Sequence, residues 1–369
     1  MTAIKQSEDG KTLTIEPGAV VKFCTGMGVL VRSKGNFVVK GVTLTHIYDD
    51  LIGGDTDGDY GMRQPEAGSY TIYGFLDDDE TTKYRARLFH HGGELLDSET
   101  WLGDYNVHFV DSDFVVPAGK TLTVEAGGIV KFVGDAQLLV RGALNVIGTR
   151  GSPVYFTSAL DDAVGGDSNG DGDATTPSWA DWLGISVEDK AKADFEHAVI
   201  RYVGSAAGAR ADASLVSYGF TTLKNCTITE SFRDGVRVAG GEFRAENSVF
   251  SHINQILLKP QGGLCEFVNC VGYDCGWVGR IYSTPHSIAG RPTVRNSIFS
   301  EIGTWLDGGE DAYEKIVFDH CCFWNSEPTE CAMTNSPANM NFYANPRFLD
   351  AENGDYHLTL GTTARNNGY

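Results

Sequence analysis

The sequence contains no long apolar run, no cluster of basic residues and no CxxC pair. A membrane-spanning helix needs about 20 predominantly apolar residues, so we predict no transmembrane segment. Nucleic-acid phosphates select clustered Lys and Arg, but 49 acidic residues outnumber 29 basic ones here, and the formal net charge is -20. We therefore predict no nucleic-acid partner. Zinc ribbons and dithiol redox sites need paired cysteines, which argues against both.

The start of the chain, MTAIKQSEDG, also lacks the apolar core of a signal peptide. An acidic chain nevertheless fits a secreted or cation-binding protein best. We expect an extracellular or cell-surface protein whose leader is absent from this chain. The cysteines leave two alternatives open, because the five-residue spacing of Cys265, Cys270 and Cys275 allows a disulfide, whereas free cysteines are commonly buried.

A long module appears twice in the sequence. GKTLTIEPGAVVKF, residues 10–23, recurs as GKTLTVEAGGIVKF, residues 119–132. Each copy continues into VLVRSKG or LLVRGAL, reaches a DD pair, and then enters an acidic glycine loop, GGDTDGD from Gly53 or GGDSNGD from Gly165. Internal repetition indicates an architecture of stacked, similar units. The sequence therefore predicts two copies of a module made of strands and an acidic loop.

A shorter period marks the second half of the chain. Asn225, Asn247, Asn269 and Asn296 occupy equivalent positions and His320 continues the series, at spacings of 22, 22, 27 and 24 residues. Short β runs with Asn at a fixed turn predict a coil of parallel strands in which equivalent residues stack. We expect each Asn to be internal and to bond the backbone of its turn and its stacked neighbours. We also expect it to adopt the left-handed conformation.

Small and large residues alternate after each member of this Asn series. A small residue follows directly and, in most turns, a large apolar residue comes two positions later, which is the period of a strand. We predict that both sets point inward, and that the cysteines among them serve core packing. The small residues are Cys226, Ser248, Cys270, Ser297 and Cys321, and the later residues are Ile228, Phe250, Gly272, Phe299 and Phe323.

These patterns favour an all-β solenoid of parallel strands over a β-sandwich, whose turns would not carry one residue type at a single register. Four segments carry a resemblance: VVPAGKTLTVEAGGIVKF, LLVRGALNVIGTRGSPVYFTS, DDAVGGDSNGDGDATTPSWADWLGI and ANPRFLDAENGDYHLTLGTTARNNG. With them the chain resembles the right-handed parallel β-helix (pectate-lyase-like) superfamily and, more narrowly, secreted bacterial β-helix repeat proteins. The resemblance implies a right-handed parallel β-helix with long acidic loops. It specifies no activity, because this fold carries lyases, hydrolases, epimerases, adhesins and stalks.

We expect a single β-helix domain over residues 1–369. Residues 1–118 are predicted to form the first copy of the module with a divergent insertion, and residues 119–204 the second copy. Residues 205–344 are predicted to form regular turns with the Asn series, and residues 345–369 a last turn and cap. An end cap is expected because each turn buries its apolar side chains only against neighbouring turns.

The second acidic loop matches the front half of a calcium-binding loop. Asp167, Asn169 and Asp171 supply alternate oxygen ligands, and the next residue, Gly172, suits the sharp turn, although Ser178 stands where such loops carry a glutamate. We predict structural Ca²⁺ in both loops; the alternative is a solvated acidic turn. The candidate ligands are Asp161, Asp162, Asp167, Asn169, Asp171 and Asp173 in the second loop, and Asp49, Asp50, Asp55, Asp57 and Asp59 in the first.

No complete catalytic motif of the polygalacturonase type (NxD, GHG, RIK) or of the pectate-lyase type (RxPxxR) is present. The longest interval in the Asn series is the best candidate for a site, because long loops commonly carry function. We predict carbohydrate contacts, and for an enzyme also the catalytic groups, from residues in and after this interval. The binding candidates are Tyr273, Asp274, Trp277, Arg291 and Trp305, and the catalytic candidates are Arg280, Tyr282 and His286.

Packing against the coil is the alternative role for these aromatic and polar side chains. For Trp179 and Trp182, which flank Asp181 at the end of the second acidic loop, packing is the role that we predict, because two large rings would anchor the loop onto the coil.

Three functions remain open from the sequence. The first is a secreted, calcium-stabilised β-helix module that binds polysaccharide at a cell surface or in a matrix. The second is a polysaccharide-degrading enzyme, a lyase before a glycoside hydrolase, and the third is a structural stalk or adhesin segment. A groove lined by Arg, Tyr and His would favour the enzyme, an aromatic face the binder, and featureless polar faces the stalk. The acidic balance disfavours anionic glycans as ligands unless calcium bridges them.

Overall fold

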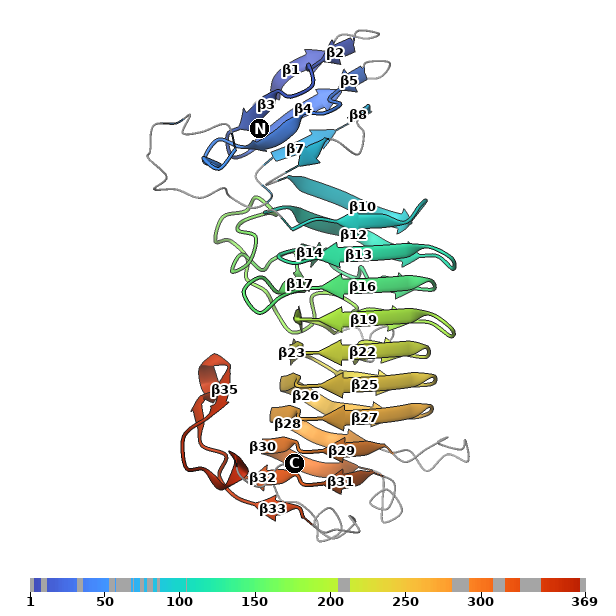
Figure 1. The fold of residues 1–369 in the computed structure, drawn as a ribbon, viewed down its shortest axis with the longest axis vertical. Coiled ribbons are helices and arrows are strands. Elements are labelled where there is room, and N and C mark those ends of the chain that lie inside the picture. Colours follow the sequence, from blue (N-terminus) through green and yellow to red (C-terminus); the bar gives the residue numbers. More distant parts are fainter. Residues whose placement is uncertain are drawn as a thin grey trace.

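The computed structural model is an elongated coil of short strands (Figure 1). Among the described residues there is no α-helix, and every pair of named strands is parallel except one hairpin. The predicted all-β parallel solenoid is therefore confirmed. The structure describes residues 3–7, 12–31, 36–52, 57, 68, 70–73, 76–77, 82–84, 87–103, 105–204, 213–280, 292–307, 316–325 and 340–365.

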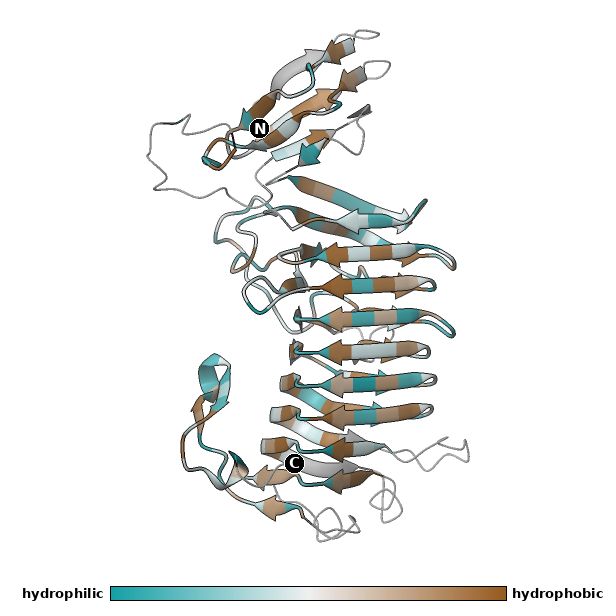
Figure 2. Ribbon diagram, in the orientation of Figure 1, coloured by the Kyte–Doolittle hydropathy of each residue, from teal (hydrophilic) through white to brown (hydrophobic). Residues whose placement is uncertain are grey.

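One face of the coil is a parallel sheet of nine strands, stacked in chain order so that each turn adds one strand. Apolar and polar residues alternate along these strands, which Figure 2 shows as alternating brown and teal bands. The strands are β11 (Glu99–Trp101), β13 (Thr121–Glu125), β16 (Ala143–Ile147), β19 (Lys192–Glu196), β22 (Phe220–Lys224), β25 (Glu242–Glu246), β27 (Leu264–Val268), β29 (Thr293–Arg295) and β31 (Val317–Asp319).

The other faces form one larger sheet made of two columns of strands. The columns join at β12, which pairs with both β14 and β15, and again at β26, which pairs with both β23 and β24. One column is β14 (Ile129–Phe132), β17 (Val154–Ser158), β20 (Ala198–Arg201) and β23 (Thr227–Ser231); the other is β15 (Leu138–Val140), β18 (Ile185–Val187), β21 (Ala213–Ser217) and β24 (Asp234–Val238). The remaining strands are β10 (Leu88–Glu94), β12 (Val107–Val116), β26 (Val249–Pro260), β28 (Val271–Arg280), β30 (Ile298–Asp307), β32 (Cys322–Trp324) and β33 (Phe342–Tyr343).

The N-terminal turns repeat this three-faced plan with their own apolar core, which includes Phe23, Phe37 and Leu44. Figure 1 shows these strands tilted against the rest of the coil. The three sheets are β1 (Ala3–Ser7), β4 (Met27–Val31) and β7 (Tyr70–Tyr73); β2 (Thr12–Thr14), β5 (Asn36–Val38) and β8 (Leu76–Asp77); and β3 (Val20–Phe23), β6 (Thr43–His46) and β9 (Lys83–Tyr84).

A stack of aromatic and imidazole rings lies where the N-terminal turns meet the longer coil. Trp101 stacks on His91 and His108 at centroid distances of 4.1 and 4.6 Å, and the two histidines share a hydrogen bond of 3.0 Å between Nε2 of His91 and Nδ1 of His108. Burial, aided by the charges of His90 and Arg87, lowers the pKa of His91 to about 3. Burial also lowers the pKa of His108 well below its ordinary range. Both rings are therefore neutral in the folded protein at neutral pH.

The small and large residues predicted to point inward are all buried, so the alternation is confirmed. The serines among them also bond the backbone: Ser248 Oγ accepts from Cys226 N, and Ser297 Oγ accepts from Cys270 N, each at 3.1 Å. A small hydroxyl at this position thus satisfies an amide of the neighbouring turn.

The Asn series adopts the predicted left-handed backbone. The φ angles of Asn225, Asn247, Asn269 and Asn296 lie between 50° and 55°, and that of His320 is 54°. One stacked pair bonds as expected, with Asn269 Nδ2 donating to Asn247 Oδ1 at 3.2 Å. The position was predicted wrongly, since the first three side chains are exposed and that of Asn296 is half-buried. Asn is needed here for its tolerance of the left-handed turn, and the buried amides use serine and main-chain partners instead.

The C-terminal segment, expected to form a last turn and cap, ends in an antiparallel hairpin of β34 (Phe348–Asp350) and β35 (Asp355–Leu358). Figure 1 shows the hairpin beside the coil. Its rings reach Tyr273 of β28, at centroid distances of 6.2 Å for Phe348 and 5.4 Å for Tyr356. Two short 3₁₀ helices, η2 (Ala351–Asn353) and η3 (Thr363–Arg365), belong to the same segment.

Candidate functional site

A second column of left-handed residues runs beside the Asn series, five positions further along each turn. Glu230, His252, Asp274 and Glu301 have φ angles of 52°, 50°, 48° and 57°, and Asn325 continues the column with 44°. Non-glycine residues in this conformation cost roughly 1–2 kcal/mol each. The column carries titratable side chains, in contrast to the nearly uniform Asn series.

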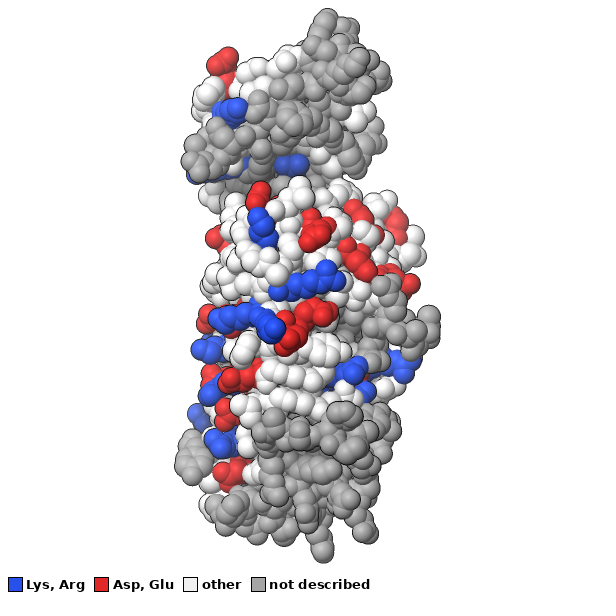
Figure 3. All heavy atoms as spheres, turned by 90° about the vertical axis from the view of Figure 1, so that its right-hand side faces the viewer, with Lys and Arg blue, Asp and Glu red and all other residues white. Residues whose placement is uncertain are grey.

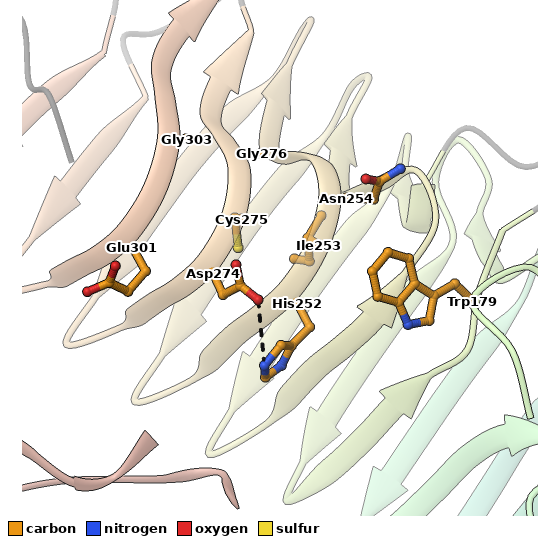
Figure 4. Close-up of a pocket in the computed structure, with 9 residues that line it drawn as sticks. All are labelled: Trp179, His252, Ile253, Asn254, Asp274, Cys275, Gly276, Glu301 and Gly303. Carbon is orange, nitrogen blue, oxygen red and sulfur yellow. Dashed lines mark ion pairs between the residues drawn. The ribbon is translucent and has the colours of Figure 1, made fainter. Parts of the chain in front are cut away.

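Three members of this column line a pocket of about 300 Å³ on the outside of the coil. Figure 4 shows His252, Asp274 and Glu301 in a row along successive turns, with Trp179 at one end. The complete lining is Trp179, His252, Ile253, Asn254, Asp274, Cys275, Gly276, Glu301 and Gly303. The pocket thus combines a large ring with a line of polar groups.

Carboxylates flank His252 on both sides. Its Nδ1 lies 3.9 Å from Glu230 Oε1, and its Nε2 lies 3.8 Å from Asp274 Oδ2. These separations bring the ring close to both acids without short hydrogen bonds. Glu301 Oε2 accepts a hydrogen bond from Asn325 Nδ2. Asp274 is the most accessible of the acids in these pairs, with 61% of its side chain exposed.

Two glycines of the lining lie where neighbouring turns approach each other closely. A Cβ on Gly276 would lie 2.5 Å from the Asn254 carbonyl oxygen, and one on Gly303 would lie 3.0 Å from that of Gly276. Neighbouring turns therefore approach too closely for any side chain at Gly276 without a shift of the backbone.

The end of the second acidic loop supplies one wall. Trp182 anchors the loop as predicted: it is buried, stacks on Phe132 at 4.0 Å, and donates from Nε1 to the Arg201 carbonyl at 2.9 Å. Trp179 is attached through its backbone, since its carbonyl accepts from Phe232 N at 3.1 Å, but the residue is 42% exposed. The exposed ring was predicted to pack on the coil and instead faces the pocket (Figure 4).

The charge of the pocket has one sign. The nine lining residues include two carboxylates and no Lys or Arg. Elsewhere, basic and acidic side chains are interspersed, as Figure 3 shows for one face of the coil, and ion pairs such as Arg244 with Glu246 and Glu266 join them. The described lining can therefore accept hydrogen bonds and attract positive charge, but includes no Lys or Arg to hold a ligand carboxylate.

The predicted binding residues divide between this pocket and other places. Asp274 lines the pocket, and Tyr273 lies next to it, with its ring 6.0 Å from that of His252. Trp277 is half-buried in β28 and is not part of the lining. Arg280 and Trp305 lie on the strands β28 and β30, but their side chains are outside the described residues, as are Tyr282, His286 and Arg291.

Sequence reasoning missed His252, Glu301 and Trp179 as pocket residues. A signal for the first two was present, because aligning the turns on the Asn series puts Glu230, His252, Asp274 and Glu301 at one shared offset. For Trp179 no such signal exists, since its contact with these turns depends on the path of a long loop.

Three carboxylates of the second acidic loop converge. Oxygen atoms of Asp162, Asp167 and Asp171 all lie within 4.8 Å of one another and could hold a metal ion. Burial raises the pKa of Asp162, and the charges of Asp167 and Asp171 raise it further, against the opposing charge of Lys131. Crowded carboxylates of this kind gain from a nearby cation.

The backbone already neutralises part of this charge. Asp167 accepts hydrogen bonds from Gly170 N and Gly172 N, both at 2.8 Å, and from Asp171 N at 3.1 Å. Other oxygens stay without a hydrogen-bond partner among the described residues, namely Oδ1 of Asp162, Asn169 and Asp171. Asn169 donates from Nδ2 to Thr175, and Asp173 is exposed outside the group of three.

Asp161 serves a buried charge network below the loop. Its Oδ2 accepts from Thr157 Oγ1 and pairs with Arg201, whose Nε and Nη2 lie at 2.8 and 2.5 Å. Lys131 is also buried and donates from Nζ to the Gly166 carbonyl at 2.8 Å. Burial lowers the pKa of Lys131 to about 8, although the charges of Asp161 and neighbouring acids raise it. The chain thus supplies two cations of its own to the loop.

The first module copy repeats part of this network. Asp49 is buried and accepts from Thr45 Oγ1 at 2.5 Å, as Asp161 does from Thr157. Lys22 pairs in register with Thr45, as Lys131 does with Thr157. Of the other predicted ligands here, Asp50 and Asp57 are half-buried, and Asp55 and Asp59 lie outside the described residues.

The described cysteines are free thiols, so the disulfide left open for Cys265, Cys270 and Cys275 does not form. Burial raises the pKa of the Cys270 and Cys275 thiols to about 12. Burial also raises the pKa of Cys226 to about 11. These thiols are unsuited to nucleophilic attack, which agrees with the predicted packing role. Cys24 is exposed, and Cys331 lies outside the described residues.

Comparison with known protein families and curated sequences does not assign this geometry to a family. No protein-family model matches the chain, and no curated protein sequence is significantly similar to it. In the described part of the chain, no helix has the length and apolarity to cross a bilayer. Function must therefore be argued from the pocket and the acidic loop themselves.

Proposed function

We propose that this protein is a secreted, calcium-stabilised β-helix module that binds a polysaccharide at a cell surface or in a matrix. The observation that carries the proposal is the pocket beside His252, where the exposed Trp179 ring meets a line of hydrogen-bonding side chains. Carbohydrate recognition combines apolar contact with a ring face and directed hydrogen bonds to hydroxyl groups. A structural stalk has no need of such a pocket.

The repeating geometry of the column favours a polymer as ligand. Glu230, His252, Asp274 and Glu301 come from four successive turns, whose strands are spaced by roughly 4.8 Å. Their side chains therefore form a linear array along the coil axis. A linear ligand of repeating units can contact several members of such an array at once, whereas a small molecule would use only one or two.

We also propose membership of the right-handed parallel β-helix superfamily. The parallel solenoid and the repeated sequence segments support this assignment, since both are typical of that superfamily.

Binding in the pocket is tested with a panel of neutral, acidic and amino polysaccharides, measured by affinity electrophoresis and calorimetry. Trp179→Ala should weaken binding about tenfold, since an aromatic side chain covered by its ligand contributes well over 1 kcal/mol. The matched control is Phe220→Ala, which removes another exposed ring, from the nine-stranded sheet. Equal weakening by both changes, or no binding to any polysaccharide, would contradict the proposal.

Calcium is proposed to stabilise the second acidic loop. Asp162, Asp167, Asn169 and Asp171 would hold it, and their oxygen-only donor set with unpartnered atoms fits a hard cation. Calcium at a hundredfold excess over its dissociation constant should stabilise the fold by about 2.7 kcal/mol. Thermal unfolding with calcium and with chelator measures this. Asp162→Asn should remove the difference, Asp173→Asn should keep it, and identical melting in both solutions would contradict calcium binding.

Hydrolysis is the second candidate function, and Asp274 and Glu301 favour it. The two carboxylates lie on adjacent turns inside one pocket, and glycoside hydrolysis needs a pair of carboxyl groups. The nine described lining residues include no Lys or Arg that could neutralise a sugar carboxylate, as a lyase must, so they suit a hydrolase better than a lyase. Release of reducing ends from a bound polysaccharide would support hydrolysis, and new ultraviolet absorbance would indicate a lyase instead.

A further inference from the structure

We infer that the pocket selects a glycan that carries free amino groups, held as ammonium ions by Asp274 and Glu301 beside the Trp179 ring. This inference rests on the proposed binding of a polysaccharide and specifies its chemical class. It excludes uronate polymers as the preferred ligand and places neutral or N-acetylated glycans second.

The charge of the lining is the first argument. Among the described lining residues there are two carboxylates and no Lys or Arg, and Glu230 adds a third acid beside His252. An ionised carboxylate only accepts hydrogen bonds, so its best partner is a charged donor. An ammonium group donates three hydrogen bonds and carries the opposite charge. A uronate would add a negative charge to a site that already has an excess of it.

The availability of the Asp274 carboxylate is the second argument. The Asp274 side chain is 61% exposed, and in the described structure its one ion pair is the loose contact of 3.8 Å with His252. By comparison, Asp234 is buried and pairs closely with Lys259 at 2.8 Å. Asp274 therefore keeps hydrogen-bonding capacity for a ligand, whereas the capacity of Asp234 is used within the fold.

The ring of Trp179 is the third argument. An indole face attracts a cation through its quadrupole, and Trp is the strongest of the aromatic side chains in this respect. Trp179 is 42% exposed, and its ring lies at the end of the row that contains His252 and Asp274 (Figure 4). A ligand with both a sugar face and an ammonium group can use the ring and the acids together.

The test compares three oligosaccharides of equal length: glucosamine hexamer, N-acetylglucosamine hexamer and galacturonic acid hexamer. Calorimetry at a pH that keeps the amines protonated should show the glucosamine hexamer binding at least about tenfold more tightly than its N-acetylated form, because charge-assisted bonds are worth more than neutral ones. This preference should shrink at high salt, which screens the exposed acids. The galacturonic acid hexamer should bind most weakly.

Single substitutions test which carboxylates cause the preference for the glucosamine hexamer. Asp274→Asn and Glu301→Gln should each weaken binding of the glucosamine hexamer by about tenfold while leaving the N-acetylated hexamer nearly unchanged. Glu242→Gln, which removes an exposed carboxylate on β25 of the nine-stranded sheet, should change neither.

The outcomes separate this inference from the proposed function. Equal affinity for the amino and N-acetylated hexamers, or tighter binding of the uronate, would overturn the inference while polysaccharide binding stands. Loss of the preference in Glu242→Gln would also overturn it. No binding of any hexamer, together with no binding of the polysaccharide panel, would remove both proposals.

Discussion

The second module copy and the second left-handed column of the regular turns, formed by Glu230, His252, Asp274 and Glu301, handle charged side chains in opposite ways. In residues 119–204, Asp161 and Lys131 are fully buried and held by partners within the chain. In that column, Asp274 is exposed, and its carboxylate lies near 4 Å from the half-buried His252 ring. Both regions stack the same kind of strand, so the strand pairing does not decide the difference.

The difference shows where a charge is structural and where it is free for a ligand. A buried charge must find partners, because its desolvation cost is large. Asp161 therefore uses its Oδ2 for Thr157 and Arg201. A charge in the second left-handed column has a small desolvation cost, so it can remain available to bind a group from solution. Four predictions test this contrast.

The largest effect is expected from removing the buried acid. Asp161→Ala should lower the free energy of unfolding by about 3–5 kcal/mol, because it leaves the Arg201 guanidinium without its carboxylate in a buried site. Urea unfolding followed by circular dichroism measures the change. Asp274→Asn is the control and should stay within about 0.5 kcal/mol. Equal losses of unfolding free energy in both variants would contradict the contrast between the buried and the exposed acid.

Acid should destabilise the fold through the imidazole rings of His91 and His108. The folded pKa of His91 is lowered to about 3 from an ordinary value of 6.5, and that of His108 is lowered too. The unfolded chain then binds more protons below pH 6.5, so stability is complete above this pH and is lost as the pH falls from 6.5 toward 3. The free energy of unfolding, measured across this pH window, should depend less on pH in a His91→Phe/His108→Phe variant. The same pH dependence in this variant as in the unchanged protein would contradict the prediction.

At the Asn positions, the free energy of unfolding should depend on the backbone conformation much more than on the polar side chain. Asn269→Val places a β-branched residue at a φ of 55° and should cost about 1–2 kcal/mol. Asn269→Gly should be nearly neutral, since glycine adopts this conformation without strain. Thermal and urea unfolding of both variants give the comparison. A larger loss for Gly than for Val would show that the side-chain bond to Asn247 matters more than the turn.

The smallest effect is expected from the second left-handed column, of Glu230, His252, Asp274 and Glu301. Asp274→Gly should change the free energy of unfolding by no more than about 0.5 kcal/mol, because it relieves a left-handed residue and removes only a loose ion pair. Urea unfolding is again the measurement. A loss of several kcal/mol would mean that the column is structural, and would weaken the argument that its carboxylates are reserved for a ligand.

Much of the fold was predictable because each turn repeats one environment. The Asn positions, the buried Cys226 and Ser248 series and the anchoring of Trp182 all follow from local rules of turn conformation and alternation. The burial of the Asn side chains was predicted wrongly, because a left-handed turn needs a permissive residue whether or not it is buried. Convergence of Asp162, Asp167 and Asp171 agrees with the loop motif.

The sequence by itself determined the period of the coil, the residues that face its interior and the left-handed turns, since these depend on neighbours within one turn and on their regular stacking. Only the tertiary structure decided which polar residues form a site. Trp179 and Glu301 are more than a hundred residues apart in the chain, and they meet at one pocket because a long loop folds back over later turns. No local preference specifies such a contact; it depends on the packing of the whole coil.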